Sequence, residues 1–171
     1  NKTGSASYIS TADLQKFNYT DINRVLRTVT GVNVYEEDGF GLRPNISLRG
    51  TSPDRSAKIT LMEDNVLIAP APYSAPAAYY FPSVARMSAV EILKGSSQIQ
   101  YGPFTTGGTI NFVSTPIPTK FNAGFLTDYG SFNTSRTVAN VGIANETVGA
   151  VVQFLNYNSD GFKNLPSGAN T

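Results

Sequence analysis

The 171-residue sequence contains no cysteine and no histidine. Within these residues, that absence excludes thiolate and imidazole metal ligands, Ser-His-Asp and Cys-His catalysis, and a disulfide framework. Charged residues are also scarce, at 15% of the chain against the roughly 25% that is usual for soluble domains. The 13 lysines and arginines are scattered and leave a net charge of only +1, so we expect no nucleic-acid partner.

Long apolar runs are missing as well. No stretch of 18 apolar residues occurs, and the opening NKTGSASYIS has no basic and apolar signal sequence. The carboxylates Glu36, Glu37 and Asp38 are typical of a solvated turn rather than of a catalytic pair. Because histidine is also absent, a soluble hydrolase is disfavoured, and we predict that the chain is not an enzyme.

Up to about residue 118, the sequence mixes signals for short helices and short strands. Thr11 and Thr20 are expected to cap two short helices, and Gly31 is expected to end the second. Strands are predicted in GVNVYE, NISLRG, KITLMEDNVLI and GTINFVS, and SAVEILKG is predicted to be a helix end running into a strand. This mixture predicts a small α+β domain.

After residue 118, the pattern changes to an alternation of period two, and three strands of about ten residues are predicted. Asn145 and Glu146 form the expected turn between the last two strands. Such strands have the length that crosses a bilayer at a tilt, although a soluble β-meander would show the same alternation. Three strands would leave two unpaired edges, so we expect the chain to be the first part of a longer protein. The first strand alternates through Phe121, Ala123, Phe125, Thr127 and Tyr129.

The glycine-rich segment YGPFTTGGTINFV does not fit a phosphate-binding loop. Such a loop leads into a helix, whereas Gly107 and Gly108 lead into β-branched residues. Together with Gly102, they are interpreted as residues that permit positive φ or the close approach of neighbouring backbone.

Two strand ends place a cation beside a glycine. These are Arg49-Gly50 and Lys94-Gly95, with Glu91 three residues before Lys94. A cation in a crowded interior needs a carboxylate partner. The alternative is an ordinary surface charge at each strand end.

Five segments, in this order, resemble the plug domain of TonB-dependent outer-membrane receptors: VLRTVTGVNV, NISLRG, ITLMEDNVLI, VEILKGSSQIQYG and GGTINFVS. The resemblance covers about residues 5–117 and implies an α+β plug domain over residues 1–117, with a small mixed sheet and short helices. It also implies that residues 118–171 hold about three of the first antiparallel strands of a 22-stranded transmembrane β-barrel and the start of an extracellular loop.

Two longer stretches, IAPAPYSAPAAYYFP and IQYGPFTTGGTINFVSTPIP, are similar to the ferric-citrate branch of that family. Two residues depart from the family pattern. Lys94 stands where most members have arginine, and an ammonium cannot form the bidentate pair that a guanidinium makes with a carboxylate. Gln100 stands where receptors of this branch tend to carry arginine, which a trianionic ligand would favour.

The resemblance implies active import across the outer membrane of a bacterial cell, without bond chemistry. The expected cargo is an iron chelate, either ferric citrate or another Fe(III)-siderophore, and no resident cofactor or protein-held metal is expected. The implied partners are the lipid bilayer and the TonB–ExbB–ExbD complex, which acts on an N-terminal box that is not recognisable in residues 1–10. The alternatives are a plug-barrel receptor for haem or a glycan, and a partner-binding signalling module without transport.

Ligand contacts are expected from the loops that follow NISLRG and NVLI and from the turn before Gly102. Hydroxyl, amide and guanidinium groups suit an oxygen-rich anion, although plain solvation of a loop would explain each residue equally well. The predicted ligand-binding residues are Thr51, Ser52, Arg55, Tyr73, Gln100 and Tyr101. The residues expected to build or gate the plug are Arg49, Gly50, Glu91, Lys94, Gly95, Gly102, Gly107 and Gly108.

Overall fold

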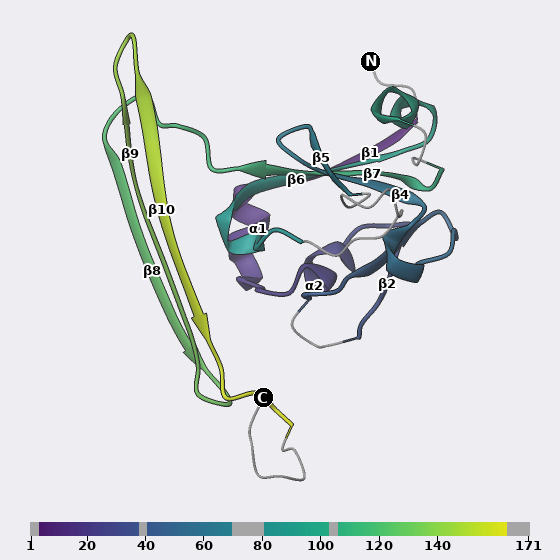
Figure 1. Ribbon diagram of the computed structural model, residues 1–171, viewed down its shortest axis with the longest axis horizontal. Coiled ribbons are helices and arrows are strands. Elements are labelled where there is room, and N and C mark those ends of the chain that lie inside the picture. The colour runs from purple at the N-terminus through teal and green to yellow at the C-terminus, as the bar shows by residue number, and fades with distance from the viewer. Residues whose placement is uncertain (1–3, 38–40, 70–80, 103–105, 164–171) are drawn as a thin grey trace. The chain divides into compact units, whose positions relative to one another are not determined.

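The computed structural model describes residues 4–37, 41–69, 81–102 and 106–163. The chain divides into two compact units, Asn1–Thr115 and Pro116–Thr171. Figure 1 shows short helices and a sheet in the first unit and long strands in the second. In these described ranges, none of the helices combines the length and the apolar character needed to span a membrane.

The first unit is built on a five-stranded mixed sheet with the order β1-β6-β7-β4-β5. β4 and β7 run parallel, and the other neighbouring strands run antiparallel. This order places β1 and β5 at the two edges. The strands are β1 Ser5–Ile9, β4 Ile59–Glu63, β5 Val66–Ala69, β6 Met87–Lys94 and β7 Gly108–Ser114.

A separate antiparallel pair and several short helices complete the first unit. The pair is formed by β2 (Val32–Tyr35) and β3 (Asn45–Leu48). The small mixed sheet with short helices confirms the predicted α+β fold. The helices are α1 Thr11–Phe17, α2 Ile22–Leu26 and the 3₁₀ helices η1 Asp54–Ser56, η2 Val84–Arg86 and η3 Ser96–Tyr101.

The core of the first unit combines side chains from α2, β3 and the central strands. Leu26, Ile46, Ile92 and Phe112 have no exposed surface. Phe81 packs edge-on against Phe112, with the ring centroids 4.9 Å apart. Because each fully buried side chain of this size stabilises a fold by about 1.5–3 kcal/mol, these residues hold the helices and the β2–β3 pair against the sheet.

Helix α1 begins one residue away from its predicted cap. Ser10, rather than Thr11, is the N-cap: its hydroxyl accepts a hydrogen bond from the Asp13 amide at 3.2 Å. The Asp13 carboxylate in turn accepts from the Ser10 hydroxyl at 2.6 Å and the Ser10 amide at 3.1 Å. These bonds hold the pKa of Asp13 below its ordinary value, first through the hydroxyl and then through the amide. Asp13 lies three residues after Ser10 and returns the hydrogen bond, which explains why Ser10 rather than Thr11 is the N-cap.

Helix α2 also differs from the prediction. Its N-cap is Asp21 rather than Thr20, and the Asp21 carboxylate accepts from the Asn23 amide at 2.8 Å. The helix ends at Leu26, so Gly31 does not end it; Gly31 instead has φ +79° just before β2. The β-branched run from residue 28 to residue 30 explains the early end, because such side chains lose rotamer freedom in a helix.

Two further differences concern strands. The segment SAVEILKG contains no helix end, since Met87–Lys94 is strand throughout. This strand lies inside the sheet, and its Val90 and Ile92 side chains are fully buried. Strand β1 was not predicted, because its residues SASYI are mostly small or polar and carry little β signal. Its pairing with β6 defines it instead.

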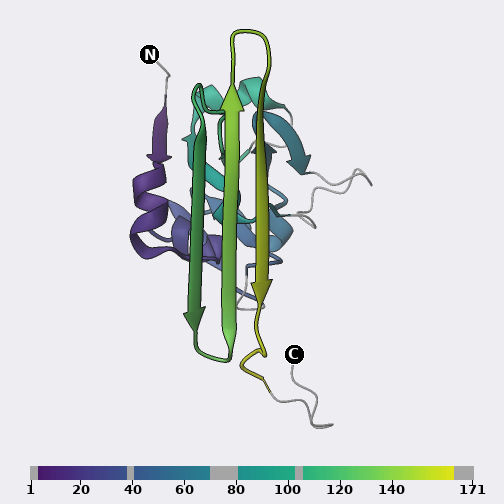
Figure 2. The ribbon, with the colours of Figure 1, turned by 90° about the vertical axis from the view of Figure 1, so that its left-hand side faces the viewer.

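The second unit is an antiparallel sheet with the order β10-β9-β8, and Figure 2 shows the three strands side by side. The strands β8 Asn122–Gly130, β9 Thr134–Ala144 and β10 Gly149–Asn158 have 9, 11 and 10 residues, close to the predicted length. The predicted turn at Asn145 is confirmed: its side-chain oxygen accepts from the amides of Thr147 and Val148 at 2.9 and 2.8 Å.

The register of this sheet separates two faces. Phe125 and Phe154 both pair with Ala139, and paired residues in adjacent strands share a face. Among the described residues, this face has no charged side chain, and we call it the apolar face. The opposite face carries the ion pair of Asp128 with Arg136. The apolar face comprises Ala123, Phe125, Thr127, Tyr129, Ser135, Thr137, Ala139, Val141, Ile143, Ala150, Val152, Phe154, Asn156 and Asn158.

A glycine at the start of β7 permits the closest approach in the first unit. A Cβ on Gly108 would overlap the Leu48 side chain and would lie 2.6 Å from the Leu93 carbonyl oxygen. We therefore predict that Gly108→Ala lowers the free energy of unfolding by about 2 kcal/mol or more, measured by urea denaturation of the full-length protein. Gly130→Ala is the control, because nothing lies within 4 Å of its Cβ position. Equal stability of the two variants would contradict the prediction.

Candidate functional site

The loop that follows β3 is held closed by polar side chains at its base. The Ser56 hydroxyl donates to the Pro44 carbonyl at 2.9 Å and accepts from the Ile46 amide at 3.0 Å. The Arg55 amide donates to the side-chain oxygen of Asn45 at 2.8 Å. Both ends of the loop are thus attached to the same stretch of chain around β3, which sets the position of residues 49–56. Asn45 and Ser56 carry this role, and the sequence analysis did not identify them.

Three of the predicted ligand-binding residues lie in this loop. The Thr51 hydroxyl donates to the Leu48 carbonyl at 3.0 Å, and the Ser52 hydroxyl accepts from the Asp54 amide at 3.4 Å. The Arg55 guanidinium lies 3.4 Å from the Glu37 carboxylate, and the Arg55 side chain is 40% exposed. A long ion pair at the surface is weak, so this contact does little to fix the position of the guanidinium.

Two other predicted ligand-binding residues lie in η3. Gln98 anchors this segment: its side-chain oxygen accepts from the Gly95 amide at 3.1 Å, and its side-chain nitrogen donates to the Thr106 carbonyl at 3.3 Å. Gln100 is exposed and Tyr101 is half-buried. The side chain of Gln98 therefore bridges the two ends of the segment that carries both residues.

The β3 loop lies against Gly107, the residue that precedes β7. The Gly107 amide donates to the Lys58 carbonyl at 2.7 Å, and a Cβ on Gly107 would lie only 2.8 Å from the Thr51 hydroxyl oxygen. Gly102 has φ +110° with open space around its Cβ position. The β3 loop therefore meets the chain just before β7, at the end of the sheet where the parallel strands β4 and β7 begin. Tyr73 lies outside the described residues.

The two predicted cation–glycine pairs also lie together. A Cβ on Gly95 would be 3.4 and 3.5 Å from the two terminal nitrogens of Arg49. The Arg49 amide donates to the Gly31 carbonyl at 3.1 Å, and Gly50 continues the turn with φ +74°. The ends of β3 and β6, which are far apart in sequence, thus converge beside the turn that precedes β2.

Lys94 fits neither interpretation drawn from the sequence. It is only 5% exposed, so it is not a surface charge. Its ammonium donates to the Thr30 carbonyl at 2.6 Å and to the Ser7 hydroxyl at 3.4 Å, both neutral oxygens. In the ion pairs seen among the described residues, Lys94 has no carboxylate partner.

Glu91 takes part in a different contact. It lies three residues before Lys94 in β6, and successive strand residues alternate between faces, so the two side chains point to opposite sides of the sheet. The Glu91 carboxylate accepts from the side-chain nitrogen of Asn111 at 3.1 Å. The side-chain oxygen of Asn111, which is 4% exposed, accepts from the Asn65 amide at 2.9 Å. The sequence analysis did not single out Asn111, the centre of this network.

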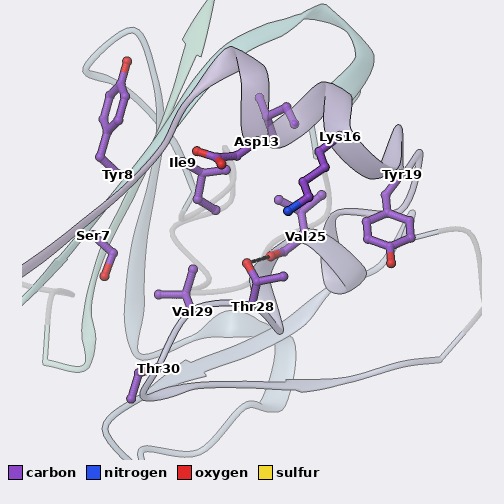
Figure 3. Close-up of a pocket in the computed structure, with 11 residues that line it drawn as sticks. Ser7, Tyr8, Ile9, Asp13, Lys16, Tyr19, Val25, Thr28, Val29 and Thr30 are labelled. Carbon is purple, nitrogen blue, oxygen red and sulfur yellow. Dashed lines mark hydrogen bonds between the residues drawn. The ribbon is translucent and has the colours of Figure 1, made fainter.

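A pocket of about 350 Å³ lies between β1 and the two helices (Figure 3). No sequence motif pointed to a site here. No group of three or more metal-binding side chains occurs in the part of the chain that the structure describes. The apolar part of the lining is Ile9, Leu14, Val25 and Val29, and the polar part is Ser7, Tyr8, Asp13, Lys16, Tyr19, Thr28 and Thr30.

Comparison with known proteins gives related transporters and receptors. The vitamin B12 transporter BtuB of Vibrio vulnificus (strain YJ016) is 28% identical over 162 residues, which are 93% of this chain and 25% of that protein. The crystal structure of the unliganded ferric citrate transporter FecA superposes with a TM-score of 0.76 at 27% identity, over 92% of this chain and 26% of that one. The ferric yersiniabactin uptake receptor FyuA of Yersinia pestis shares the fold, with a TM-score of 0.72, 24% identity and coverage of 98% and 26%.

The chain spans about a quarter of the length of these relatives. Because the relatives are transporters and receptors, they agree with the prediction that the chain is not an enzyme. The family model described as the TonB-dependent receptor plug domain matches residues 1–109, which is more than half of the chain. The chain therefore belongs to the TonB-dependent receptor plug domain family.

Proposed function

We propose that this chain is the plug and the first barrel strands of a bacterial outer-membrane receptor that imports a scarce iron chelate. The match of residues 1–109 to the plug domain family carries this proposal. Two of the structural relatives are described as a ferric citrate transporter and a ferric yersiniabactin uptake receptor. An Fe(III) chelate is therefore favoured as the class of cargo, with ferric citrate as the first candidate. The iron would be cargo inside its chelator, and the chain would hold no cofactor of its own.

The second unit supports a location in the outer membrane. Its strands have the length expected for tilted membrane-spanning strands, and its apolar face lacks charge while the opposite face carries Asp128 and Arg136. We propose that the apolar face contacts lipid and that further strands of the full-length protein complete a 22-stranded barrel. Transport would then draw energy from the TonB–ExbB–ExbD complex of the inner membrane.

A pair of adjacent substitutions tests this assignment of faces. Val152 lies on the apolar face near the middle of β10, and Gln153 lies on the other face. We predict that Val152→Arg destabilises the full-length protein in lipid vesicles by about 2–4 kcal/mol, measured by urea unfolding. Gln153→Arg adds the same charge on the opposite face and is expected to cost clearly less. Equal losses in the two variants would contradict lipid contact at the apolar face.

We propose that the cargo binds to the β3 loop and to the segment that carries Gln100 and Tyr101. The β3 loop offers the hydroxyls of Thr51 and Ser52 and the Arg55 guanidinium, and the second segment offers the exposed amide of Gln100. A guanidinium and several hydroxyls suit a carboxylate-rich chelate, because charge-assisted hydrogen bonds to carboxylates are about twice as strong as neutral ones. Tyr73 remains a predicted ligand contact.

The binding role of Arg55 is testable in the full-length receptor in detergent. We predict that Arg55→Ala weakens the binding of ferric dicitrate about tenfold or more, because a hydrogen bond to a charged group contributes about 1.5–3 kcal/mol. Arg27→Ala is the matched control: it removes an exposed arginine that pairs with Glu36 at 3.0 Å and lies outside the β3 loop. Unchanged affinity in Arg55→Ala, with binding by the wild type, would remove Arg55 from the site.

The choice of cargo is tested by the same titration with other ligands. Iron-free citrate, an unrelated ferric siderophore and vitamin B12 are compared with ferric dicitrate; vitamin B12 is included because the relative BtuB is described as its transporter. Binding of ferric dicitrate alone would support the ferric-citrate assignment. Binding of another ligand would keep the import proposal and replace the cargo. A receptor that binds a partner protein but takes up none of these solutes would favour the signalling alternative.

A further inference from the structure

We infer that Asn45 is a positioning residue of the proposed cargo site: it holds Arg55 in a strained backbone conformation and so sets the direction of the guanidinium. The inference rests on the proposed function for the cargo that the guanidinium meets, whereas the strain is a property of the first unit alone. Three features carry it: the backbone of Arg55, the acceptor that Asn45 supplies and the hydroxyl of Ser56.

The first feature is the backbone of two neighbouring residues in η1. Arg55 has φ +49° and ψ +24°, and Ser56 has φ +56°. This left-handed region is unfavourable for a residue with a Cβ, and glycine, asparagine and aspartate are its usual occupants. A long side chain is held there only where the surroundings impose the conformation, and such strain gathers at sites that clamp a ligand.

The second feature is the side chain of Asn45, which begins β3 and is only 3% exposed. Its backbone pairs with Tyr35 of β2, and its side-chain nitrogen donates to the Tyr35 carbonyl at 3.5 Å. The side-chain oxygen accepts from the Arg55 amide at 2.8 Å. A residue fixed by strand pairing thus supplies the acceptor toward which the Arg55 N–H points.

The third feature is Ser56, which is also 3% exposed. Its hydroxyl donates to the Pro44 carbonyl at 2.9 Å and accepts from the Ile46 amide at 3.0 Å, so it bonds both neighbours of Asn45. Three consecutive residues therefore hold two consecutive strained ones. Relaxation of Arg55 to negative φ would leave buried polar groups of this set without partners, which costs more than a typical hydrogen bond gains.

The strain bears on binding because it sets where the guanidinium starts from. The φ of Arg55 fixes the direction in which its Cβ leaves the loop. The ion pair with Glu37 is long, at 3.4 Å, and lies at the surface, so it orients the guanidinium only weakly. A group that is already oriented loses less conformational entropy when a ligand binds. Asn45 thus raises the affinity through Arg55, without contact between its own buried side chain and the cargo.

Two pairs of variants of the full-length protein test the strain without any cargo. We expect the unfolding equilibrium constant of Arg55→Gly to be about threefold lower than that of Arg55→Ala in urea denaturation, because glycine adopts positive φ without steric cost. Lys58→Gly and Lys58→Ala are the matched control pair. Lys58 is exposed and its φ is not positive, so there the glycine variant is expected to be the less stable one. A glycine variant at residue 55 that is no more stable than the alanine variant would overturn the inference.

Binding of ferric dicitrate by the full-length receptor in detergent tests the positioning role. We expect Asn45→Ala to weaken binding about fivefold, and to have no further effect in the Arg55→Ala background, because no guanidinium is left to orient. Asn33→Ala removes an exposed asparagine from β2 and is the control, with unchanged affinity expected. Unchanged affinity in Asn45→Ala, or an equal loss in both backgrounds, would contradict positioning through Arg55.

Hydrogen exchange separates failure of this inference from failure of the proposed cargo. Measured by mass spectrometry, exchange of the amides of residues 54–57 is expected to be about tenfold faster in Asn45→Ala than in the wild type, since one hydrogen bond is lost, and unchanged in Asn33→Ala. If the wild type binds no ferric dicitrate, the cargo assignment fails, and faster exchange still supports Asn45 as the residue that holds Arg55. Unchanged exchange would overturn the inference whatever the cargo. If Asn45→Ala does not fold, the glycine and alanine variants at residue 55 decide.

Discussion

The close approach of β3 to the start of β7 is the constraint on which the first unit depends. Leu48, at the end of β3, is fully buried and occupies the space that a side chain on Gly108 would need. Through this contact, the β2–β3 pair is seated against the five-stranded sheet. The next residues, from Arg49 onward, form the loop that meets Gly107. Because Gly107 and Gly108 have no side chains, β3 and the loop after it can lie close to the start of β7. This close approach sets the position of the proposed binding loop.

Several polar side chains are buried or half-buried in the first unit, and four of them join separate segments of the chain. Asn45 and Ser56 close the β3 loop, Asn111 joins β6 to the turn between β4 and β5, and Lys94 joins β6 to the turn before β2. Hydrogen bonds of this kind add little net stability but penalise any other arrangement of the same groups. These hydrogen bonds therefore favour one packing of the first unit over its alternatives.

Sequence patterns predicted the elements whose signals are local. The turn Asp64-Asn65 was predicted between two apolar runs, and both residues have positive φ, as a tight hairpin turn needs. The alternating strands β8, β9 and β10 were predicted for the same reason. Strand β1 and the burial of Lys94 were not predicted, because both depend on the pairing of β1 with β6, two segments that are far apart in sequence. For the candidate site, the sequence predicted which kinds of residue take part. It did not predict which residues lie beside each of them in the folded chain.

The two cation–glycine pairs show why the neighbours matter. Arg49 follows the last residue of β3, and its positive φ of 55° turns the chain so that its side chain reaches the surface beside Gly95. Lys94 is the last residue of β6 but is still paired with Ser5 of β1, so its side chain stays inside. The same two-residue pattern therefore gives one exposed and one buried cation. Strand order, rather than the pattern itself, decides which cation reaches the surface and which one is covered by a neighbouring strand.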